Sequence, residues 1–259
     1  MHALLFLCLR QCHMQKPEPS KHFQSEFIMN TTRSVLLLLV IAATMTCCTG
    51  ERMLMRKGER ILFLGDSITE QGVKPNGYVS LLREELNARY PDLGIEVIGA
   101  GISGNKVTDL EKRLAKDVIE RNPTIVVVYI GINDVWHWAL DNHKGTTKEE
   151  FESVLREIVA RIRYSGAETL LCTPTVIGEI PDSTLGQNSM LEEYCAISRK
   201  IAKDQGIRLC DLRKAFVAHL TEHNKEKSEK NILTTDGVHL NNAGNRLVAD
   251  EMLRFLGGR

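Results

Sequence analysis

The sequence predicts a three-layer α/β fold, in which helices cover both faces of a doubly wound parallel sheet. From Arg60 onward, short apolar runs alternate with amphipathic stretches, as expected when strands and helices alternate along a chain. The run 125–130 is apolar at every position, which is typical of a strand buried on both faces. A length of 259 residues suits one such domain with additional segments.

The elements follow one another in regular order, and right-handed crossovers are expected between the strands. Capping-box patterns support two of the helix starts, at Thr108 with Glu111 and at Ser189 with Glu192. Strands are expected over residues 61–64, 95–99, 124–130, 169–173 and 207–210. Helices are expected over residues 78–89, 108–121, 148–164, 189–204, 213–222 and 243–255.

The first fifty residues are not expected to belong to this fold. Residues 34–50 carry no charge, Arg33 precedes their short apolar core, and small residues follow it, as in a secretory signal. A membrane anchor is the alternative, but spanning needs about 20 apolar residues and this core is shorter. We expect a leader and secretory or lipoprotein signal over 1–50 and a single domain over 51–259. The protein would be exported, either periplasmic, secreted or lipid-anchored through Cys47 or Cys48.

Charge and cysteine content narrow the possible partners. Lys and Arg number 33, as do Asp and Glu, so there is no basic excess to bind nucleic acid. Cys172, Cys195 and Cys210 form an odd set in the expected domain, which leaves at least one unpaired. Cys172 and Cys210 could be neighbours near strand ends, or all three could be small buried thiols. No zinc motif is present, and the sequence indicates no metal and no cofactor.

Three polar segments each follow one of the expected strands. Asp66 and Ser67 follow the first strand, residues 101–105 the second and residues 131–134 the third. Ligands of open parallel sheets bind beyond the carboxyl ends of the strands. We therefore expect these segments to meet at one edge of the sheet and to form a site there.

Ser67 has two interpretations at this stage. It could be a nucleophile presented at the end of a buried strand, or the N-cap of a helix, because Ser67 and Glu70 form a capping box. A serine nucleophile needs a base to remove its proton, and His239 is a candidate. Asp236 lies three residues before His239 and could orient it, although Asp236-Gly237 is also an ordinary turn sequence.

Other residues near these segments could bind substrate. The Asn133 amide and the backbone N–H of Gly104 could donate to an oxyanion, although both also suit simple turns. Trp136 and Trp138 could line a pocket for an acyl group or sugar ring, or pack at the rim of the sheet. The segment 177–187 is a candidate substrate wall, and His137 and His143 are interpreted as surface residues.

These segments together resemble the four blocks of the GDSL, or SGNH, hydrolases. The blocks are Gly65-Asp66-Ser67-Ile68, Gly104, Gly131-x-Asn133-Asp134 and Asp236-x-x-His239, in family order and strand context. Ile68 replaces the leucine of the family name, and the resemblance covers nearly all of residues 60–256.

The resemblance implies a flavodoxin-like, five-stranded parallel sheet of order 2-1-3-4-5 and hydrolysis of esters or thioesters through an acyl-enzyme, without a metal. It implies that Ser67 is the nucleophile, His239 the base and Asp236 its orienting acid. The N–H groups of Ser67 and Gly104, with the Asn133 side chain, would form the oxyanion hole. Asp66 and Asp134 would shape the surrounding loops.

The substrate class is also suggested by resemblance. The run 131–138 is similar to bacterial members that act on short acyl esters, including acetylated sugars, so with export we expect an acetyl ester on a carbohydrate. A lysophospholipase or thioesterase is the alternative within the family. A carbohydrate-binding protein without catalytic activity is the alternative outside it, and the intact Ser67, Asp236 and His239 argue against it.

Overall fold

The computed structural model describes residues 55–140, 144–180 and 186–257. The predicted leader, with Cys47 and Cys48, lies outside the described residues, as does His143. Within the described ranges, none of the helices combines the length and the apolar character that crossing a membrane requires.

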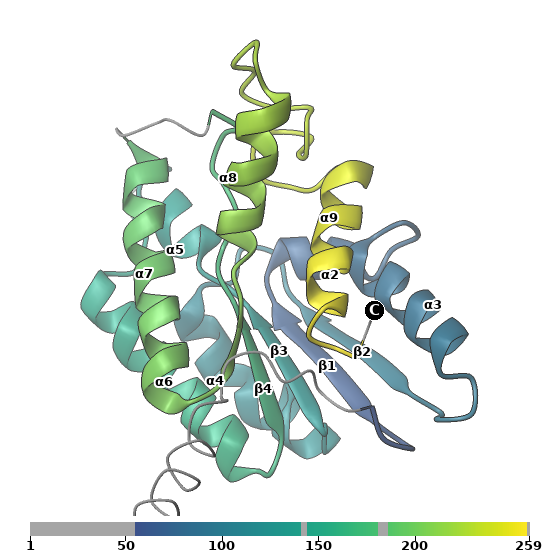
Figure 1. Ribbon diagram of the computed structural model, residues 1–259. Helices are drawn as coiled ribbons and strands as arrows, with labels where there is room; N and C mark the ends of the chain where they lie inside the picture. The colour runs from purple at the N-terminus through teal and green to yellow at the C-terminus, as the bar shows by residue number, and fades with distance from the viewer. Residues whose placement is uncertain (1–54, 141–143, 181–185, 258–259) are drawn as a thin grey trace, which may run out of the picture. The chain divides into compact units, whose positions relative to one another are not determined.

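Five parallel strands form one sheet of order β2-β1-β3-β4-β5, and this confirms the predicted fold class (Figure 1). Leu62 on β1 pairs with Ile98 on β2 and with Val126 on β3. All five residues of β3 are buried, as its continuous apolar run predicted. The strands are β1 (Arg60–Gly65), β2 (Glu96–Gly101), β3 (Ile125–Tyr129), β4 (Glu168–Cys172) and β5 (Arg208–Cys210).

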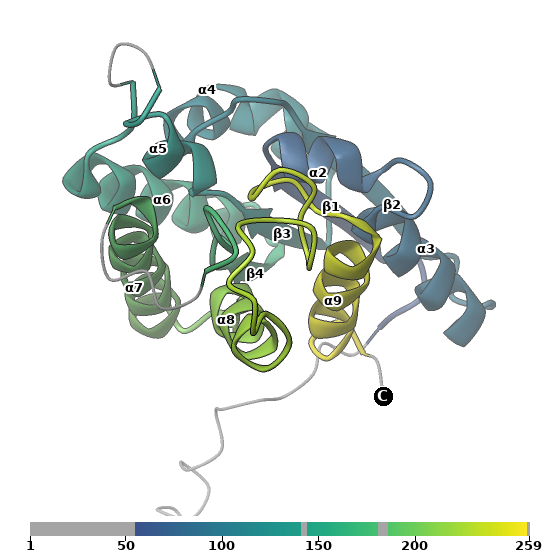
Figure 2. The same cartoon turned by 90° about the horizontal axis from the view of Figure 1, so that it is seen from above.

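Six longer helices cover the sheet, and each occurs where the sequence predicts one. Seen from above, α3, α8 and α9 lie on one face, and α4, α6 and α7 lie on the other (Figure 2). In α6, the spacing of Phe151, Leu155, Ile158 and Ile162 turns one apolar stripe into the core. These helices are α3 (Tyr78–Arg89), α4 (Val107–Asp117), α6 (Lys148–Tyr164), α7 (Gln187–Gln205), α8 (Leu212–His223) and α9 (Asn242–Leu253).

Shorter helices lie in the connections. A 3-10 turn, η1 (Ile119–Arg121), follows α4. α2 (Ser67–Gly72) and α5 (Ile132–Trp136) directly follow β1 and β3 and were not among the predicted helices. Both therefore lie at the carboxyl ends of the strands, which we call the carboxyl edge of the sheet.

The two predicted capping boxes, and the one that was the alternative interpretation of Ser67, are wrong, because each helix begins one or more residues earlier than its pattern suggested. Asp66, Lys106 and Gly186 are the N-cap residues of α2, α4 and α7. Ser67 is thus the first residue inside α2. The side chain of Asp66 caps this helix instead of that of Ser67, because its carboxylate accepts the Ile68 N–H at 2.9 Å.

The cysteines of the domain are free thiols, and all three are buried. Cys172 and Cys210 pair directly across β4 and β5, so the sequence-based expectation that they are neighbours is confirmed. They form no disulfide in the structure.

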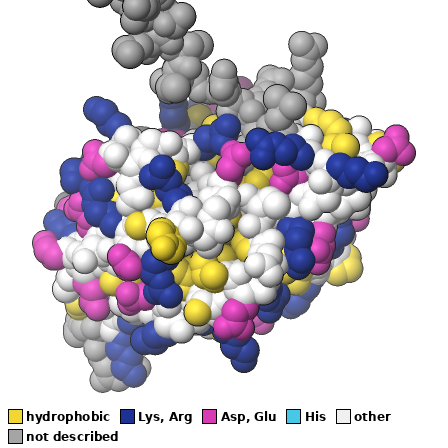
Figure 3. Space-filling view, turned by 90° about the horizontal axis from the view of Figure 1, so that it is seen from below, with side chains coloured by type: hydrophobic (Ala, Val, Ile, Leu, Met, Phe, Trp, Pro, Cys, Tyr) yellow, Lys and Arg dark blue, Asp and Glu magenta, His cyan; other side chains and the backbone are white. Residues whose placement is uncertain are grey.

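The opposite edge, at the amino ends of the strands, carries ion pairs between partly exposed side chains. Arg60 at the start of β1 contacts Glu96 at the start of β2, with 3.1 Å between Nε and Oε2. Arg208 at the start of β5 contacts Glu168 at the start of β4, at 2.7 Å. Seen from this side, Lys, Arg, Asp and Glu side chains surround a central area of hydrophobic and uncharged surface (Figure 3). We call this the amino edge.

Candidate active site

The turn from β1 into α2 places Ser67 at the carboxyl edge. The chain folds back so tightly that a Cβ on Gly65 would lie 2.1 Å from Thr69 Oγ1 and 2.7 Å from the Tyr129 carbonyl oxygen. Only glycine fits there, so α2 begins immediately after the strand. Ser67 is the first residue of that helix, where the helix dipole favours negative charge.

Ser67 is hydrogen-bonded to His239, and His239 to Asp236. The distance from Ser67 Oγ to His239 Nε2 is 2.9 Å, and the distance from His239 Nδ1 to Asp236 Oδ2 is 2.7 Å. An ionised carboxylate can only accept a hydrogen bond, so Nδ1 carries the ring proton and Nε2 is free to accept the serine proton. The structure therefore brings together the three residues that the sequence proposed as nucleophile, base and acid.

Asp236 is held by the turn that follows it. Its Oδ1 accepts the backbone N–H groups of Val238 at 3.0 Å and His239 at 2.8 Å. Partial burial works to raise the pKa of Asp236, but the hydrogen bonds from the His239 ring and from this backbone lower it below its usual value. The carboxylate thus stays ionised beside the imidazole.

The predicted oxyanion-hole residues Asn133 and Gly104 lie on connected segments. Asn133 is the second residue of α5, and its Nδ2 donates to the carbonyl oxygen of Asn105 at 3.0 Å, directly after Gly104. Gly104 sits in an exposed turn at φ +77°, a conformation that favours glycine, with no neighbouring atom within 4 Å of where a Cβ would be. The amide keeps a second N–H beyond the one used on Asn105.

Arg113, on α4, was missed by sequence reasoning and holds these segments together. Its guanidinium donates to the carbonyl oxygens of Gly65 at 2.7 Å and Ala100 at 2.9 Å, near the ends of β1 and β2, and to Asn105 Oδ1 at 2.8 Å. The sequence did contain a signal for this role, because Arg113 falls on the same face of the predicted helix as Leu110 and Leu114, both of which are buried.

Glu70, on α2, closes the other side of the same turn. Its carboxylate accepts the N–H of Ser103 at 2.5 Å and the hydroxyl of Ser103 at 2.6 Å. These bonds hold the pKa of Glu70 below its usual value. The glutamate that suggested a capping box for Ser67 therefore joins α2 to the loop that carries Gly104.

Asp66 and Asp134 are both buried behind the site. Burial raises the pKa of Asp66 to about 7 and that of Asp134 to about 6. Asp134 accepts the backbone N–H of Val107, the first residue of α4, at 3.2 Å, as Asp66 accepts that of Ile68. Each carboxyl group thus accepts a hydrogen bond at the start of a helix, and the loop-shaping role that the resemblance implies for both stays a prediction.

The two tryptophans lie in different surroundings. The Trp136 ring meets the His239 ring edge to face, with 6.1 Å between centroids. Trp138 instead donates its Nε1–H to the Thr146 carbonyl oxygen at 3.3 Å. It lines a cavity of about 510 Å³ with Met190 and Tyr194, and Ser67 and His239 are not among the lining residues.

Of the segment predicted as a substrate wall, residues 181–185 lie outside the described residues. Its first part turns inward, and Glu179 is fully buried. His137, interpreted as a surface residue, is half-buried, and burial lowers its pKa. Among the described residues, no group of three or more His, Cys, Asp or Glu side chains is arranged to hold a metal ion.

Comparisons with known proteins identify the family of this chain. The sequence model of the GDSL-like lipase/acylhydrolase family matches residues 63–247. The acetylxylan esterase of Geobacillus stearothermophilus is 32% identical over 219 residues, which cover 79% of this chain and 97% of that protein. The crystal structure of the acetyl xylan esterase AlAXEase is 42% identical, covers 74% of this chain and 97% of its own, and superposes with a TM-score of 0.72.

Catalytic mutants of the Geobacillus enzyme have also been solved, with alanine in place of a serine, an aspartate or a histidine. Each is 31% identical to this chain and covers 80% of it and 98% of its own length, with TM-scores of 0.71 to 0.72. In that enzyme the aspartate and the histidine lie three residues apart. With its sheet order and the matched residues, this chain belongs to the GDSL-like lipase/acylhydrolase family and is a carboxylic ester hydrolase.

Proposed function

We propose that this protein removes acetyl groups from carbohydrates by nucleophilic catalysis, with Ser67 as the nucleophile. The observation that carries the proposal is the continuous hydrogen-bonded chain from Ser67 Oγ through the His239 ring to Asp236. A serine hydroxyl becomes an effective nucleophile only when a base removes its proton as it attacks. His239 lies at hydrogen-bonding distance for that transfer, and Asp236 stabilises the imidazolium that results.

In the first half-reaction, Ser67 Oγ attacks the carbonyl carbon of the ester and its proton passes to His239 Nε2. The resulting oxyanion would accept hydrogen bonds from the N–H groups of Ser67 and Gly104 and from the free N–H of the Asn133 amide. Removing one such donor typically costs about 2.7–4 kcal/mol of transition-state stabilisation. The sugar alcohol then leaves with the proton held on His239, and an acetyl group remains on Ser67.

In the second half-reaction, His239 removes a proton from water, and the water oxygen attacks the acetyl-Ser67 carbonyl carbon. The same donors stabilise the second tetrahedral intermediate. Collapse of this intermediate releases acetate, and Ser67 Oγ regains its proton from His239. Every proton in the cycle thus passes through one imidazole nitrogen, and the chemistry needs no group beyond the chain and water.

The substrate class rests on three supports. Two similar proteins are described as acetylxylan esterases, and one of them has catalytic serine, aspartate and histidine residues. The spacing of its aspartate and histidine equals that of Asp236 and His239. Trp136 packs edge to face against the ring of the proposed base His239, and an aromatic ring at this position suits a small acyl group and a sugar ring.

Acyl-chain selectivity and acetate release test this proposal together. We expect 4-nitrophenyl acetate to be hydrolysed faster than the butyrate, octanoate or decanoate, and acetate to be released from acetylated xylooligosaccharides. A preference for long chains, lysophospholipids or acyl thioesters would reject the acetyl-carbohydrate assignment. Carbohydrate affinity without turnover of any ester would reject an enzyme altogether.

The role of Ser67 has its own test. A fluorophosphonate probe should label the wild-type protein and fail to label Ser67→Ala. Ser103→Ala serves as the matched control, because Ser103 is an exposed serine of the neighbouring loop that we do not propose as the nucleophile. Labelling that persists in Ser67→Ala would remove Ser67 from the mechanism.

We further propose that residues 1–50 direct export and that the domain spans 51–259. Expression of the full chain in a bacterial host, followed by fractionation and fatty-acid labelling, tests this. Export with label that disappears only in the Cys47→Ser or Cys48→Ser variant would identify a lipid anchor. Export without label would indicate a cleaved signal, and retention in the cytoplasm would contradict both.

A further inference from the structure

Glu179 lies after β4, and its carboxylate is fully buried. It accepts four hydrogen bonds from one short segment. Oε2 accepts the backbone N–H of Ile232 at 2.7 Å, and Oε1 accepts those of Leu233 at 2.7 Å and Thr234 at 2.5 Å. Oε1 also accepts the hydroxyl of Thr234 at 2.6 Å. A buried carboxylate needs such donors because it has lost its hydration, and these donors belong to the loop that leads to Asp236 and His239.

The Thr234 hydroxyl carries this contact onward to the proposed acid and base. It donates to Glu179, and its oxygen accepts the backbone N–H of Gly237 at 3.1 Å. Gly237 is the residue directly after Asp236, at φ +97° in the turn that brings Asp236 and His239 together. The carbonyl oxygen of Gly237 accepts the N–H of Gly178 at 2.8 Å. The Gly178–Glu179 pair therefore contacts this turn at two points.

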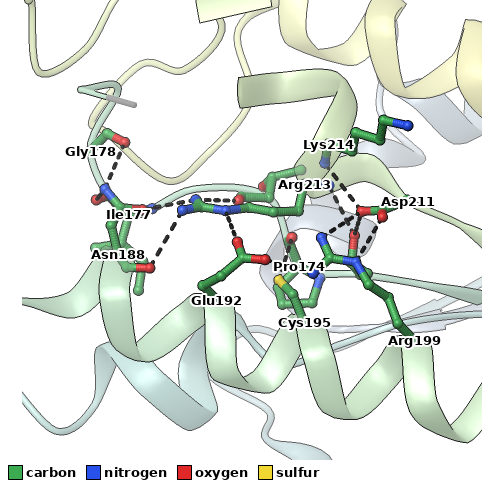
Figure 4. Close-up of polar contacts among 12 residues, drawn as sticks. Pro174, Ile177, Gly178, Asn188, Glu192, Cys195, Arg199, Asp211, Arg213 and Lys214 are labelled. Atoms are coloured by element: carbon green, nitrogen blue, oxygen red, sulfur yellow. Dashed lines mark hydrogen bonds and ion pairs between the residues drawn. The ribbon is translucent and has the colours of Figure 1, made fainter. Parts of the chain in front are cut away.

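The segment that carries Glu179 is itself anchored at the starts of α7 and α8 (Figure 4). Asn188 donates to the carbonyl oxygen of Ile177 at 2.6 Å and accepts the N–H of Ile177 at 3.2 Å. The buried Arg213 guanidinium donates to Asn188 Oδ1 at 2.9 Å and to the Thr175 carbonyl oxygen at 3.0 Å. Glu192 pairs with the same guanidinium at 3.0 Å. The Glu179 backbone thus has a fixed position from which its side chain can hold the loop.

We propose that Glu179 is a positioning residue, which acts through the Thr234 hydroxyl to hold the turn of Asp236 and His239 in register with Ser67. Ser67 is on α2, whereas His239 is on the loop between α8 and α9, so their hydrogen bond depends on the placement of that loop. A displacement of about 1 Å at a reacting group can cost about 100-fold in rate. This inference rests on the proposed roles of Ser67, Asp236 and His239.

The two acceptor oxygens of Glu179, and not only the size of its side chain, should matter. A glutamine side chain at this position would have the same shape as the glutamate, but its NH₂ group would face an N–H donor of the loop instead of accepting from it. We therefore expect Glu179→Gln to lower kcat on 4-nitrophenyl acetate by about 100-fold. KM should stay within about twofold, because the substrate pocket is untouched and only transition-state stabilisation is lost.

Two variants of Thr234 test the relay, which is the contact from Glu179 through the Thr234 hydroxyl to the backbone of Gly237. Thr234→Val keeps the shape and removes the hydroxyl, and we expect kcat to fall by about 10-fold. Thr234→Ser keeps the hydroxyl and should remain within about twofold of wild type. If one relay connects the residues, the double variant Glu179→Gln/Thr234→Val should be no slower than Glu179→Gln alone by more than about twofold.

If Glu179 only stabilised the fold, its variants would lower Tm and leave kcat of the folded protein unchanged. Leu155→Ala, in the buried stripe of α6, is the control: it should lower Tm, while kcat at 25 °C stays unchanged in the folded protein. The inference is overturned if Glu179→Gln folds and keeps kcat within about threefold, or if Thr234→Val and Thr234→Ser behave alike. The Thr234 pair decides the matter if Glu179→Gln does not fold. Ser67→Ala is assayed alongside: if it stays active, the proposed mechanism fails, whatever the Glu179 variants show.

Discussion

Two carboxylates at the amino edge and three at the carboxyl edge differ in their exposure and in their partners. At the amino edge, Glu96 and Glu168 are partly exposed and pair with arginine side chains. At the carboxyl edge, Asp66, Asp134 and Glu179 are buried and accept backbone N–H groups. A partly exposed arginine side chain is flexible and hydrated, whereas a backbone N–H is fixed to the chain, so the second arrangement defines the position of a loop more closely.

The two kinds of carboxylate differ in what they contribute to the folded protein, either a small amount of stability or the fixed position of a loop. Exposed ion pairs contribute about 0–1 kcal/mol, so the amino edge can vary with little effect. Burying a carboxylate opposes folding unless its hydrogen bonds are complete, and the raised pKa values of Asp66 and Asp134 report that opposition. The buried carboxylates of the carboxyl edge therefore lower the stability of the protein, but they fix the loops around Ser67.

The largest contrast should come from Ser67→Ala at the carboxyl edge. We expect kcat to fall by about 10⁵- to 10⁶-fold, because the proposed nucleophile is lost, while the free energy of unfolding changes little. Arg60→Ala at the amino edge should leave kcat unchanged. Steady-state kinetics on 4-nitrophenyl acetate with both variants checks this, and comparable activity in the two would contradict the assignment of the site to the carboxyl edge.

The second effect is a pH dependence of stability that comes from Asp66. Its pKa is about 7 in the folded protein against 3.8 as its ordinary value, so folding favours the protonated form. This stability is fully present below pH 4 and is lost as the pH rises through about 7. The loss is of the order of 4 kcal/mol, since one unit of pKa shift corresponds to about 1.4 kcal/mol.

Asp66→Asn should remove that loss, because asparagine keeps the cap on Ile68 and does not ionise. The variant should be more stable than wild type at pH 8 and similar to it at pH 4, as measured by urea unfolding. Glu96→Gln at the amino edge is the control and should follow the wild-type pH dependence. An unchanged pH profile in Asp66→Asn would show that another group is responsible.

A third effect concerns the contact of β2 with α2. A Cβ on Gly101 would lie 2.2 Å from the Glu70 nitrogen and 2.7 Å from the Asp66 carbonyl oxygen, both backbone atoms. We expect Gly101→Ala to reduce the free energy of unfolding by about 1–3 kcal/mol and to lower kcat, because α2 carries Ser67.

Gly99→Ala is the matched control on the same strand. Its Cβ would lie 2.2 Å from Val73 Cγ1, at the end of a partly exposed side chain that can turn away. Denaturant unfolding and kinetics of the two variants should therefore differ, with the milder loss in Gly99→Ala. Equal losses would mean that the approach of α2 to β2 is not the constraint.

The smallest effect is expected at the amino edge itself. Glu96→Gln should change the free energy of unfolding by less than about 1 kcal/mol, because the Arg60–Glu96 pair is exposed and screened by salt. Urea unfolding at low and high salt measures this, and the small difference should shrink as salt is added. A salt-independent loss would indicate that the amino edge is more tightly packed than its exposure suggests.

The sheet and its edge of polar residues were readable from the sequence because both follow from local pattern. Apolar runs locate the strands, and the direction of parallel strands places Ser67, Gly104 and Asn133 on one edge. The first residues of the helices were harder to predict from the sequence. Ser67 and Ser189 matched capping boxes, yet the chain turns into each helix before them, and the glutamates of both patterns contact other elements.

The supporting residues were not predictable, because their roles depend on distant partners. Glu179 lies in a segment with the pattern of a surface loop, and its donors are more than fifty residues further along the chain. Short helices such as α5 have too few turns to be stable alone, so packing and not local preference decides them. Asn133 therefore matched a turn in the sequence and lies in a helix in the structure.

The hydrogen bond between Ser67 and His239 joins residues 172 positions apart. Ser67 lies at the start of α2, directly after the first strand of the domain, whereas His239 follows α8 and lies just before α9. A chain that is truncated before His239 would therefore contain the proposed nucleophile without its proposed base. Under the proposed mechanism, hydrolytic activity would begin only after nearly all of the domain has folded. The onset of activity would therefore mark the last step of folding.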